Sequence, residues 1–178
     1  MKKFLLLALF ISAIHLSAQT DQRIYDIIDA VSDERIENDV TKLANFGTRH
    51  TLSDTVSNTR GIGAARRWIK SEFDKTSATC NSCLTVFFQK DLVKKGANNR
   101  IVKDVEVVNV LAIQKGTKYP NRYIIMSGDI DSRVSDPTNY TDDSPGANDN
   151  ASGMAGTLEA ARVLSKYTFE NSIIYMGL

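Results

Sequence analysis

Apolar residues recur at helical spacing in three segments of the first half of the chain. Residues 24–31, 33–44 and 61–73 each place them on one side of a helix of 3.6 residues per turn. In the third segment they fall at positions i, i+3, i+4 and i+8, which is typical of a stripe that faces a core. This stripe consists of Ala65, Trp68, Ile69 and Phe73.

Segments rich in β-branched and aromatic residues follow these helices. Residues 84–89 and 105–113 are predicted as the first two strands. Residues 122–127 form a nearly continuous apolar run, which is typical of a central strand buried on both faces. Residues 172–178 are again apolar and are predicted as a final strand.

A polar loop and a helix connect the last two predicted strands. The loop covers residues 128–150, and residues 151–166 form a helix rich in alanine and glycine, which can lie close to a sheet. Such a strand–loop–helix–strand unit is typical of two parallel strands joined by a crossover. We therefore expect an α/β fold, with helices on both faces of a mixed, mainly parallel β-sheet.

The first residues differ from the rest and are typical of a secretory signal peptide. A short basic start precedes an apolar run over residues 4–16, and Ser17 and Ala18 supply small side chains. The run is short for a membrane span, although an N-terminal anchor is the alternative. We expect cleavage near Ala18 or Gln19, export to the periplasm or medium, and a mature domain over residues 19–178.

Charge excludes several classes of partner. Removing residues 1–18 takes away Lys2 and Lys3 and leaves one more acidic than basic residue. The mature chain thus has no basic excess with which to bind nucleic acid or an anionic membrane surface. We expect no stable membrane insertion, and the sequence does not indicate an oligomeric state.

The two cysteines, Cys80 and Cys83, are spaced C-x-x-C. This spacing occurs in zinc sites and in redox motifs, but no second pair completes a zinc site, and a strand follows the pair where a thioredoxin-like motif needs a helix. Export favours a local disulfide, with two free thiols as the alternative.

The polar loop gathers the residues that could carry chemistry. Carboxylates at the end of a strand and at the start of a helix are common cation ligands. We expect functional roles for Asp129, Asp131 and Asp149, which occupy the strand end and the helix start. Ordinary turn roles are expected for Asp136, Asp142 and Asp143. Asn150 is the expected cap of the following helix, and His50 is expected to be an ordinary loop histidine.

Four motifs resemble one known family. Residues 145–153, P-G-A-N-D-N-A-S-G, are similar to the P-G-A-D-D-N-A-S-G signature of the two-zinc exopeptidases. This family includes bacterial leucyl aminopeptidases, glutamate carboxypeptidases and glutaminyl cyclases. Residues 128–132 resemble the family segment that carries its first zinc-binding histidine. Residues 46–49 (F-G-T-R) and 64–69 (A-A-R-R-W-I) resemble its N-terminal motifs.

The resemblance implies roles for three aspartates. Asp149 corresponds to the carboxylate that bridges two zinc ions. Asp131 corresponds to a catalytic-site aspartate that orients the first zinc-binding histidine. Asp129 stands where the family has that histidine. An aspartate can bind zinc at a similar distance, but it is shorter, negative, and unable to donate a hydrogen bond to Asp131.

The resemblance also implies a fold and an activity. The fold is the zinc-exopeptidase sandwich of phosphorylase/hydrolase type. The activity is that of a zinc-dependent exopeptidase, of the aminopeptidase type, which hydrolyses peptide bonds through a metal-activated water. A catalytically degenerate binding module on the same fold is the alternative, because of Asp129. A nucleotide-sugar transferase with a D-x-D motif at residues 129–131 is a weaker reading, since no glycine-rich phosphate loop accompanies it.

In the family pattern, the general-base glutamate and the later metal ligands follow the strand that matches residues 172–178. We therefore expect residues 19–178 to be the N-terminal part of a peptidase domain, incomplete at its C-terminus and inactive alone. The sequence does not distinguish an aminopeptidase from a carboxypeptidase or a cyclase, and it does not indicate the preferred side chain.

Overall fold

The computed structural model describes residues 21–178, which divide into two units at Ala30. The signal peptide expected over residues 1–18 therefore lies outside the described residues. The described residues of the first unit form one short helix, α2 (Gln22–Asp29), whose first turn is capped by the Asp21 carboxylate accepting from the Arg23 amide at 3.0 Å. Between residues 21 and 178, no helix has the length and apolar character that crossing a bilayer requires.

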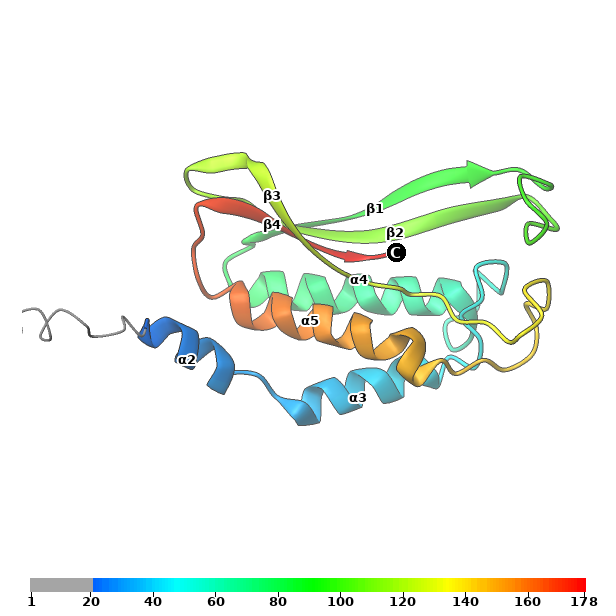
Figure 1. Ribbon diagram of the computed structural model, residues 1–178, viewed down its shortest axis with the longest axis horizontal. Helices are drawn as coiled ribbons and strands as arrows, with labels where there is room; N and C mark the ends of the chain where they lie inside the picture. Colours follow the sequence, from blue (N-terminus) through cyan, green and yellow to red (C-terminus); the bar gives the residue numbers. More distant parts are fainter. Residues whose placement is uncertain (1–20) are drawn as a thin grey trace, which may run out of the picture. The chain divides into compact units, whose positions relative to one another are not determined.

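The second unit contains the other helices and all the strands predicted from the sequence, in the predicted order (Figure 1). Its helices are α3 (Asp33–Ala44), α4 (Gly61–Thr79) and α5 (Ser152–Leu164). Its strands are β1 (Leu84–Val93), β2 (Val105–Gln114), β3 (Tyr119–Gly128) and β4 (Asn171–Gly177). A single π-helical turn, η1 (Ala147–Ala151), leads into α5.

The four strands form one mixed sheet in the order β1-β2-β4-β3. β3 and β4 pair in parallel, as the strand–loop–helix–strand unit predicts. The other two pairings are antiparallel, so the expectation of a mainly parallel sheet is wrong for the described residues. The reason is that β1 and β2 form a hairpin, and β4 inserts beside β2 in the opposite direction. The α/β class with a mixed sheet flanked by helices is confirmed.

The third strand does not occupy the central position that its apolar run predicts. β3 lies at an edge of the described sheet and pairs only with β4. Tyr123, Ile124 and Ile125 are consequently about half exposed. A continuous apolar run thus indicated a strand correctly here but did not indicate its place in the sheet.

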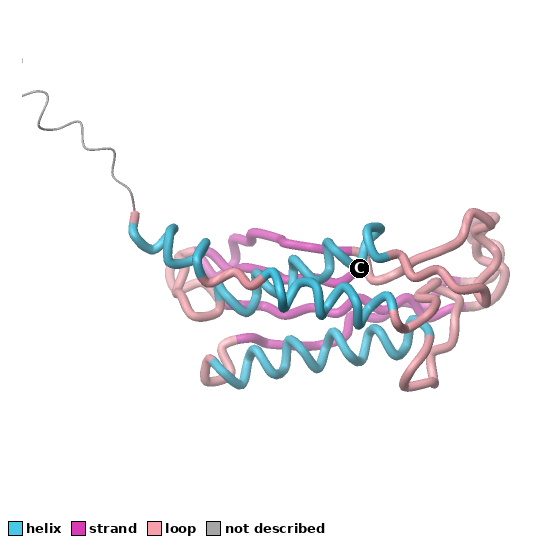
Figure 2. The backbone as a smooth tube through the Cα atoms, turned by 90° about the horizontal axis from the view of Figure 1, so that it is seen from below, coloured by secondary structure: helices cyan, strands magenta, loops and turns pink. Residues whose placement is uncertain are grey.

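The three helices of the second unit lie on one face of the sheet, rather than on both as predicted (Figures 1 and 2). α4 packs against β1 and β2, α5 packs against β3 and β4, and α3 packs on α5. The predicted stripe of α4 is buried in this layer, with Ala65, Ile69 and Phe73 fully buried and Trp68 partly buried against the same core. Small residues bring α5 close to the sheet: Ala155 and Ala161 are fully buried.

Acidic side chains gather where the three helices meet. Asp39 of α3 is half-buried, and burial together with the nearby charge of Glu72 raises its pKa to about 6. Glu159 of α5 is buried and accepts hydrogen bonds from the Ser32 amide and the Arg162 guanidinium. No donor in the described part of the chain forms a hydrogen bond with the Asp39 carboxylate, so burying its charge costs more than burying that of Glu159.

A disulfide joins Cys80 to Cys83, as the spacing and the expected export predict. The bond closes a tight turn between the end of α4 and the start of β1. Asn81 and Ser82 within the turn both adopt positive φ angles.

Candidate metal-binding cleft

The predicted site residues Asp129 and Asp131 follow directly after β3, at the end of its parallel pairing with β4. The Ile130 amide donates to the Leu178 carbonyl at 2.7 Å, which continues the pairing of β3 with β4 beyond Gly128. Ile130 is buried against Gly177 and anchors this extension. Since side chains alternate along an extended strand, Asp129 and Asp131 point away from the core that holds Ile130.

Asp129, Asp131 and Asp149 line one cleft of about 450 Å³, together with residues of the loop that follows Asp131. Asp129 and Asp131 reach it from the end of β3, and Asp149 reaches it from η1, just before α5. The structure therefore brings together all three aspartates for which the sequence predicts a functional role. The other three loop aspartates serve turns and surface contacts: Asp136 accepts from Thr138, Asp142 accepts from Asn139, and Asp143 pairs with Arg60.

Arg133 also lines this cleft, but it donates to the Val134 carbonyl and forms no ion pair with the cleft's carboxylates among the described residues. Burial and the adjacent charge of Asp129 raise the pKa of Asp131, while a long hydrogen bond from Thr51, at 3.4 Å, acts in the opposite direction. Among residues 21–178, no side chain or amide donates to the carboxylates of Asp129 or Asp149, and neither forms an ion pair. Both carboxylates are therefore free to bind a cation.

Asn150 positions the first of these aspartates. Its side-chain oxygen accepts from the Asp129 amide at 3.1 Å. The expectation that Asn150 caps α5 is wrong, because the chain turns through η1 and the cap position falls on Ala151. The Asp149–Asn150 peptide bond is cis. A Cβ atom added to Gly153 would lie 2.1 Å from the Asn150 side-chain oxygen, so only glycine leaves room for this contact.

Arg49 binds backbone carbonyls of residues 130–146, the loop that lines the cleft. Its role is the main feature of the site that the sequence did not predict. Its side chain is fully buried and donates to four carbonyl oxygens. The acceptors and donor–acceptor distances are Ile130 at 2.8 Å, Leu43 at 2.9 Å, Pro145 at 2.5 Å and Gly146 at 3.0 Å. Burial lowers the pKa of Arg49 to about 10, so it remains charged at neutral pH. The F-G-T-R motif at residues 46–49 contains this arginine, but the family resemblance alone assigns it no role.

Hydroxyl groups and a histidine complete the connection between the N-terminal segment and the loop. Ser132 accepts from the Arg49 amide at 3.1 Å and donates to the Ser144 carbonyl at 2.5 Å. His50 is buried, accepts from the Leu52 amide through Nδ1, and contacts the Pro137 carbonyl through Nε2 at 3.0 Å. The neutral tautomer with a proton on Nε2 satisfies both contacts. His50 is thus a structural loop histidine, as expected.

The cleft fits part of a metal site. Its donor set is hard oxygen, with unpaired carboxylates that a divalent cation would neutralise. Within residues 21–178, however, no three His, Cys, Asp or Glu side chains are gathered closely enough to hold a metal ion by themselves. The described aspartates could therefore supply some of the ligands of a zinc ion but not a complete set.

The chain is similar in sequence to one peptidase family and to several zinc metalloproteases. Residues 109–177 match the model of Peptidase family M28. A probable zinc metalloprotease of Pyrenophora teres f. teres is 48% identical over 154 residues, which cover 86% of this chain and 32% of that protein. A probable zinc metalloprotease of Pyricularia oryzae is 44% identical over 92% of this chain and 32% of its own length. The chain thus spans about a third of the curated relatives it matches.

Solved structures share the fold at low sequence identity. A leucine aminopeptidase precursor from Bacteroides thetaiotaomicron superposes with a TM-score of 0.60 and 20% identity, covering 83% of this chain and 47% of that one. Tannerella forsythia glutaminyl cyclase gives a TM-score of 0.62 at 16% identity, covering 83% and 46%. The resemblance predicted from the loop motif is therefore confirmed: part of this chain matches Peptidase family M28, the chain is similar in sequence to probable zinc metalloproteases, and it shares the fold of a leucine aminopeptidase precursor and a glutaminyl cyclase.

Proposed function

We propose that this chain supplies the aspartate side of the zinc site in a zinc-dependent exopeptidase of the aminopeptidase type. The observation that carries the proposal is the shared cleft of Asp129 and Asp149, whose carboxylates have no other partner among the described residues. The names of the zinc metalloprotease relatives and the fold shared with a leucine aminopeptidase precursor support the same activity. Peptides are the proposed substrates.

Asp149 and Asp129 are the residues proposed to hold zinc. Asp149 would act as the bridging carboxylate of a two-ion site, and Asp129 would be a terminal ligand. Bound zinc would supply Lewis-acid polarisation of the scissile carbonyl. Asp131, which lines the same cleft, would position Asp129 and the metal through its charge. In the family pattern the remaining ligands and the general base come from residues that follow β4.

The replacement of the family's histidine by Asp129 supports a second candidate function. Asp129 and Asp131 place two like charges side by side, and a carboxylate at position 129 cannot use the neighbouring Asp131 as a hydrogen-bond acceptor. A protein in which this change abolished one metal position would keep the fold as a peptide-binding module without turnover. Zinc content and hydrolysis, measured on one preparation, distinguish the two functions.

The test compares Asp149→Ala with the parent protein, each produced from the longest reading frame that contains these 178 residues. Asn148→Ala is a matched control, because Asn148 is an exposed neighbour that does not line the cleft. We expect the parent to bind zinc and to hydrolyse an aminoacyl p-nitroanilide, Asn148→Ala to do the same, and Asp149→Ala to lose both. Full zinc occupancy in Asp149→Ala would refute its assignment as a ligand. Zinc binding without hydrolysis by the parent would favour the binding module.

Export is proposed as well, and the disulfide between Cys80 and Cys83 supports it because such bonds persist in oxidising compartments. N-terminal sequencing of the protein recovered outside the cytoplasm should begin near Gln19. An intact Met1 on that material would contradict cleavage of a signal peptide.

A further inference from the structure

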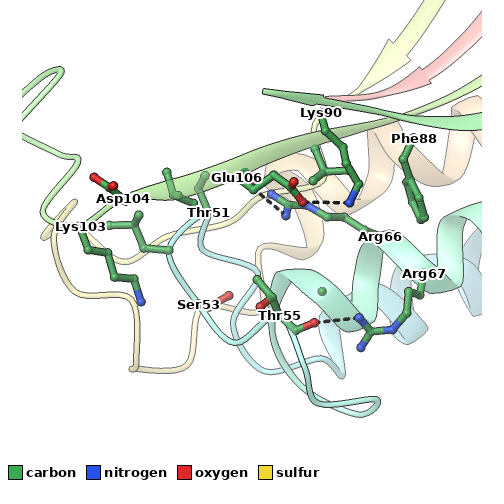
Figure 3. Close-up of a pocket in the computed structure, with 14 residues that line it drawn as sticks. Thr51, Ser53, Thr55, Arg66, Arg67, Phe88, Lys90, Lys103, Asp104 and Glu106 are labelled. Atoms are coloured by element: carbon green, nitrogen blue, oxygen red, sulfur yellow. Dashed lines mark hydrogen bonds and ion pairs between the residues drawn. The ribbon is translucent and has the colours of Figure 1, made fainter. Parts of the chain in front are cut away.

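A second cleft lies between α4 and the hairpin of β1 and β2, and the proposed zinc chemistry does not use it. Its volume is about 570 Å³, within the range of small-molecule sites (Figure 3). Apolar walls come from Leu52, Phe88 and Val108, and positive charge comes from Arg66, Lys90 and Lys103. A site with these walls suits an organic anion better than an inorganic one, because an apolar body would be buried along with the charge.

Arg66 is the unusual residue of this cleft. Its side chain leaves α4 and reaches under β2 toward Glu106 (Figure 3), and the residue is only 7% exposed. It makes one hydrogen bond, from Nη1 to the backbone carbonyl of Glu106 at 3.3 Å. Its Nε is buried and has no partner. Among residues 21–178, no carboxylate oxygen lies within 4.0 Å of this guanidinium.

The two buried arginines of the chain are therefore in opposite situations. Arg49 donates to four carbonyl oxygens and has a clear structural role. Arg66 is nearly as buried but has a single weak acceptor. An unpaired buried cation lowers stability, so a residue of this kind indicates a missing partner of opposite charge. Burial lowers the pKa of Arg66 to about 10, which still leaves it charged at neutral pH.

Nearby acidic groups attract Arg66 only from a distance: the charges of Glu106 and Asp131 act to raise its pKa, but neither carboxylate forms an ion pair with it among the described residues. Glu106 directs its carboxylate to Lys90, at 3.0 Å, and both side chains are about half exposed. Asp104 is held by Lys94, at 2.8 Å, and by the Lys95 amide. Both rim carboxylates thus already have cationic partners of their own.

The contacts given for Lys103 and Arg67, the other two basic residues of the cleft, are with an aromatic ring and with uncharged oxygens. Lys103 lies over the Tyr140 ring, with its ammonium nitrogen 4.1 Å from the ring centroid, and it forms no ion pair within residues 21–178. Arg67 donates to backbone carbonyls, including that of Thr55 at 2.8 Å. A smaller cavity of about 160 Å³ shares Arg66 with this cleft and Asp131 with the candidate metal-binding cleft.

We propose that the cleft over Arg66 binds the C-terminal carboxylate of a short peptide, with the adjoining apolar side chain against Leu52, Phe88 and Val108. The guanidinium of Arg66 pairs with the carboxylate, and Lys90 and Lys103 add longer-range attraction. The identity of the ligand as a peptide rests on the proposed function, whereas the binding of a carboxylate does not.

The test measures binding to zinc-free protein in EDTA, so that neither turnover nor metal chelation contributes. The probes are N-acetyl-phenylalanine, its uncharged amide, and inorganic phosphate. Calorimetry or NMR measures the affinity for each. We expect the acid to bind and the amide to bind at least tenfold more weakly, because the amide cannot form a charge-assisted hydrogen bond with the Arg66 guanidinium. Binding of the acid should also weaken as salt is added. Equal binding of acid and amide, or binding of phosphate alone, would overturn the proposal.

Variants separate a binding role from a structural one. Arg66→Met should weaken binding of the acid about tenfold or more while keeping or raising the melting temperature, because it removes an unpaired buried cation. Lys118→Gln, which removes a lysine outside the cleft that pairs with Glu170, is the charge-matched control and should bind like the parent. If Arg66→Met does not fold, the double variant Lys90→Gln/Lys103→Gln takes its place, with an expected loss of at least threefold. Parent-like binding by whichever variant folds would refute the site.

Discussion

Arg49 offers the sharpest test of how the candidate metal-binding cleft is held. Arg49→Met removes the guanidinium but keeps an unbranched apolar side chain of similar length. The four carbonyl oxygens that accept from Arg49 then lose their donor, and two of them, those of Pro145 and Gly146, belong to the loop that leads to Asp149.

The size of the effect follows from two opposing terms. A hydrogen bond from a charged donor contributes about 1.5–3 kcal/mol, and Arg49 makes four of them. Keeping a charged group buried costs several kcal/mol, and Met would not carry that cost. The bonds outweigh the cost because every acceptor is met at 3.0 Å or less. We therefore expect the free energy of unfolding to fall by about 3–5 kcal/mol.

Urea unfolding followed by circular dichroism measures this difference, with zinc affinity as a second readout. Arg67→Met is the control, since Arg67 also donates to backbone carbonyls but is exposed. It should lower stability by less than about 1 kcal/mol. Arg49→Lys keeps the charge without the planar fork and should fall between the two. A loss below about 1 kcal/mol in Arg49→Met would refute the view that this arginine holds the loop.

Three further predictions concern other parts of the fold. Because the pKa of Asp39 is raised to about 6, its carboxyl lowers stability progressively as the pH rises from about 4 through 6. Asp39→Asn should therefore raise the free energy of unfolding by roughly 1 kcal/mol at pH 7, allowing for solvent screening, and by almost nothing at pH 4; urea titrations giving equal gains at both pH values would contradict this. Gly153→Ala should destabilise the protein by about 1–3 kcal/mol in the same assay, because its Cβ would meet Asn150, whereas Gly156→Ala meets no atom within 4 Å and should be neutral or stabilising. Thiol labelling of unreduced protein should find neither cysteine reactive, and two labelled thiols would refute the disulfide.

The sequence predicted local structure well where apolar spacing is regular. α3 begins and ends at the predicted residues, and the Ser32 hydroxyl caps it by accepting from the Arg35 amide. α4 continues six residues beyond the predicted Phe73, to Thr79. The buried position of its last turns is Ser77, which hydrogen-bonds to Leu84, and a serine carries no apolar signal. Strand order and the single helical face could not be predicted, because both depend on contacts between distant segments.

The sequence predicted the acidic side chains of the candidate site, but it did not predict the residues that hold them in position. The positions of Asp129, Asp131 and Asp149 follow from strand ends and a loop motif, and all three line one cleft. Arg49 and Asn150 act through backbone atoms of distant residues. Backbone groups are the same at every position, so sequence patterns give no indication of which carbonyl or amide a side chain will meet.

The distance along the chain between Arg49 and its acceptors has a consequence for the order of folding. Three of the four carbonyls lie 81 to 97 residues further along the chain, so these contacts close a long loop and gain nothing until the helices and sheet are in place. The cleft should accordingly be among the last regions to form and among the first to open. Amide hydrogen exchange in residues 130–146 should then be faster than in α4 and should accelerate together with exchange near Arg49, since one side chain secures both segments.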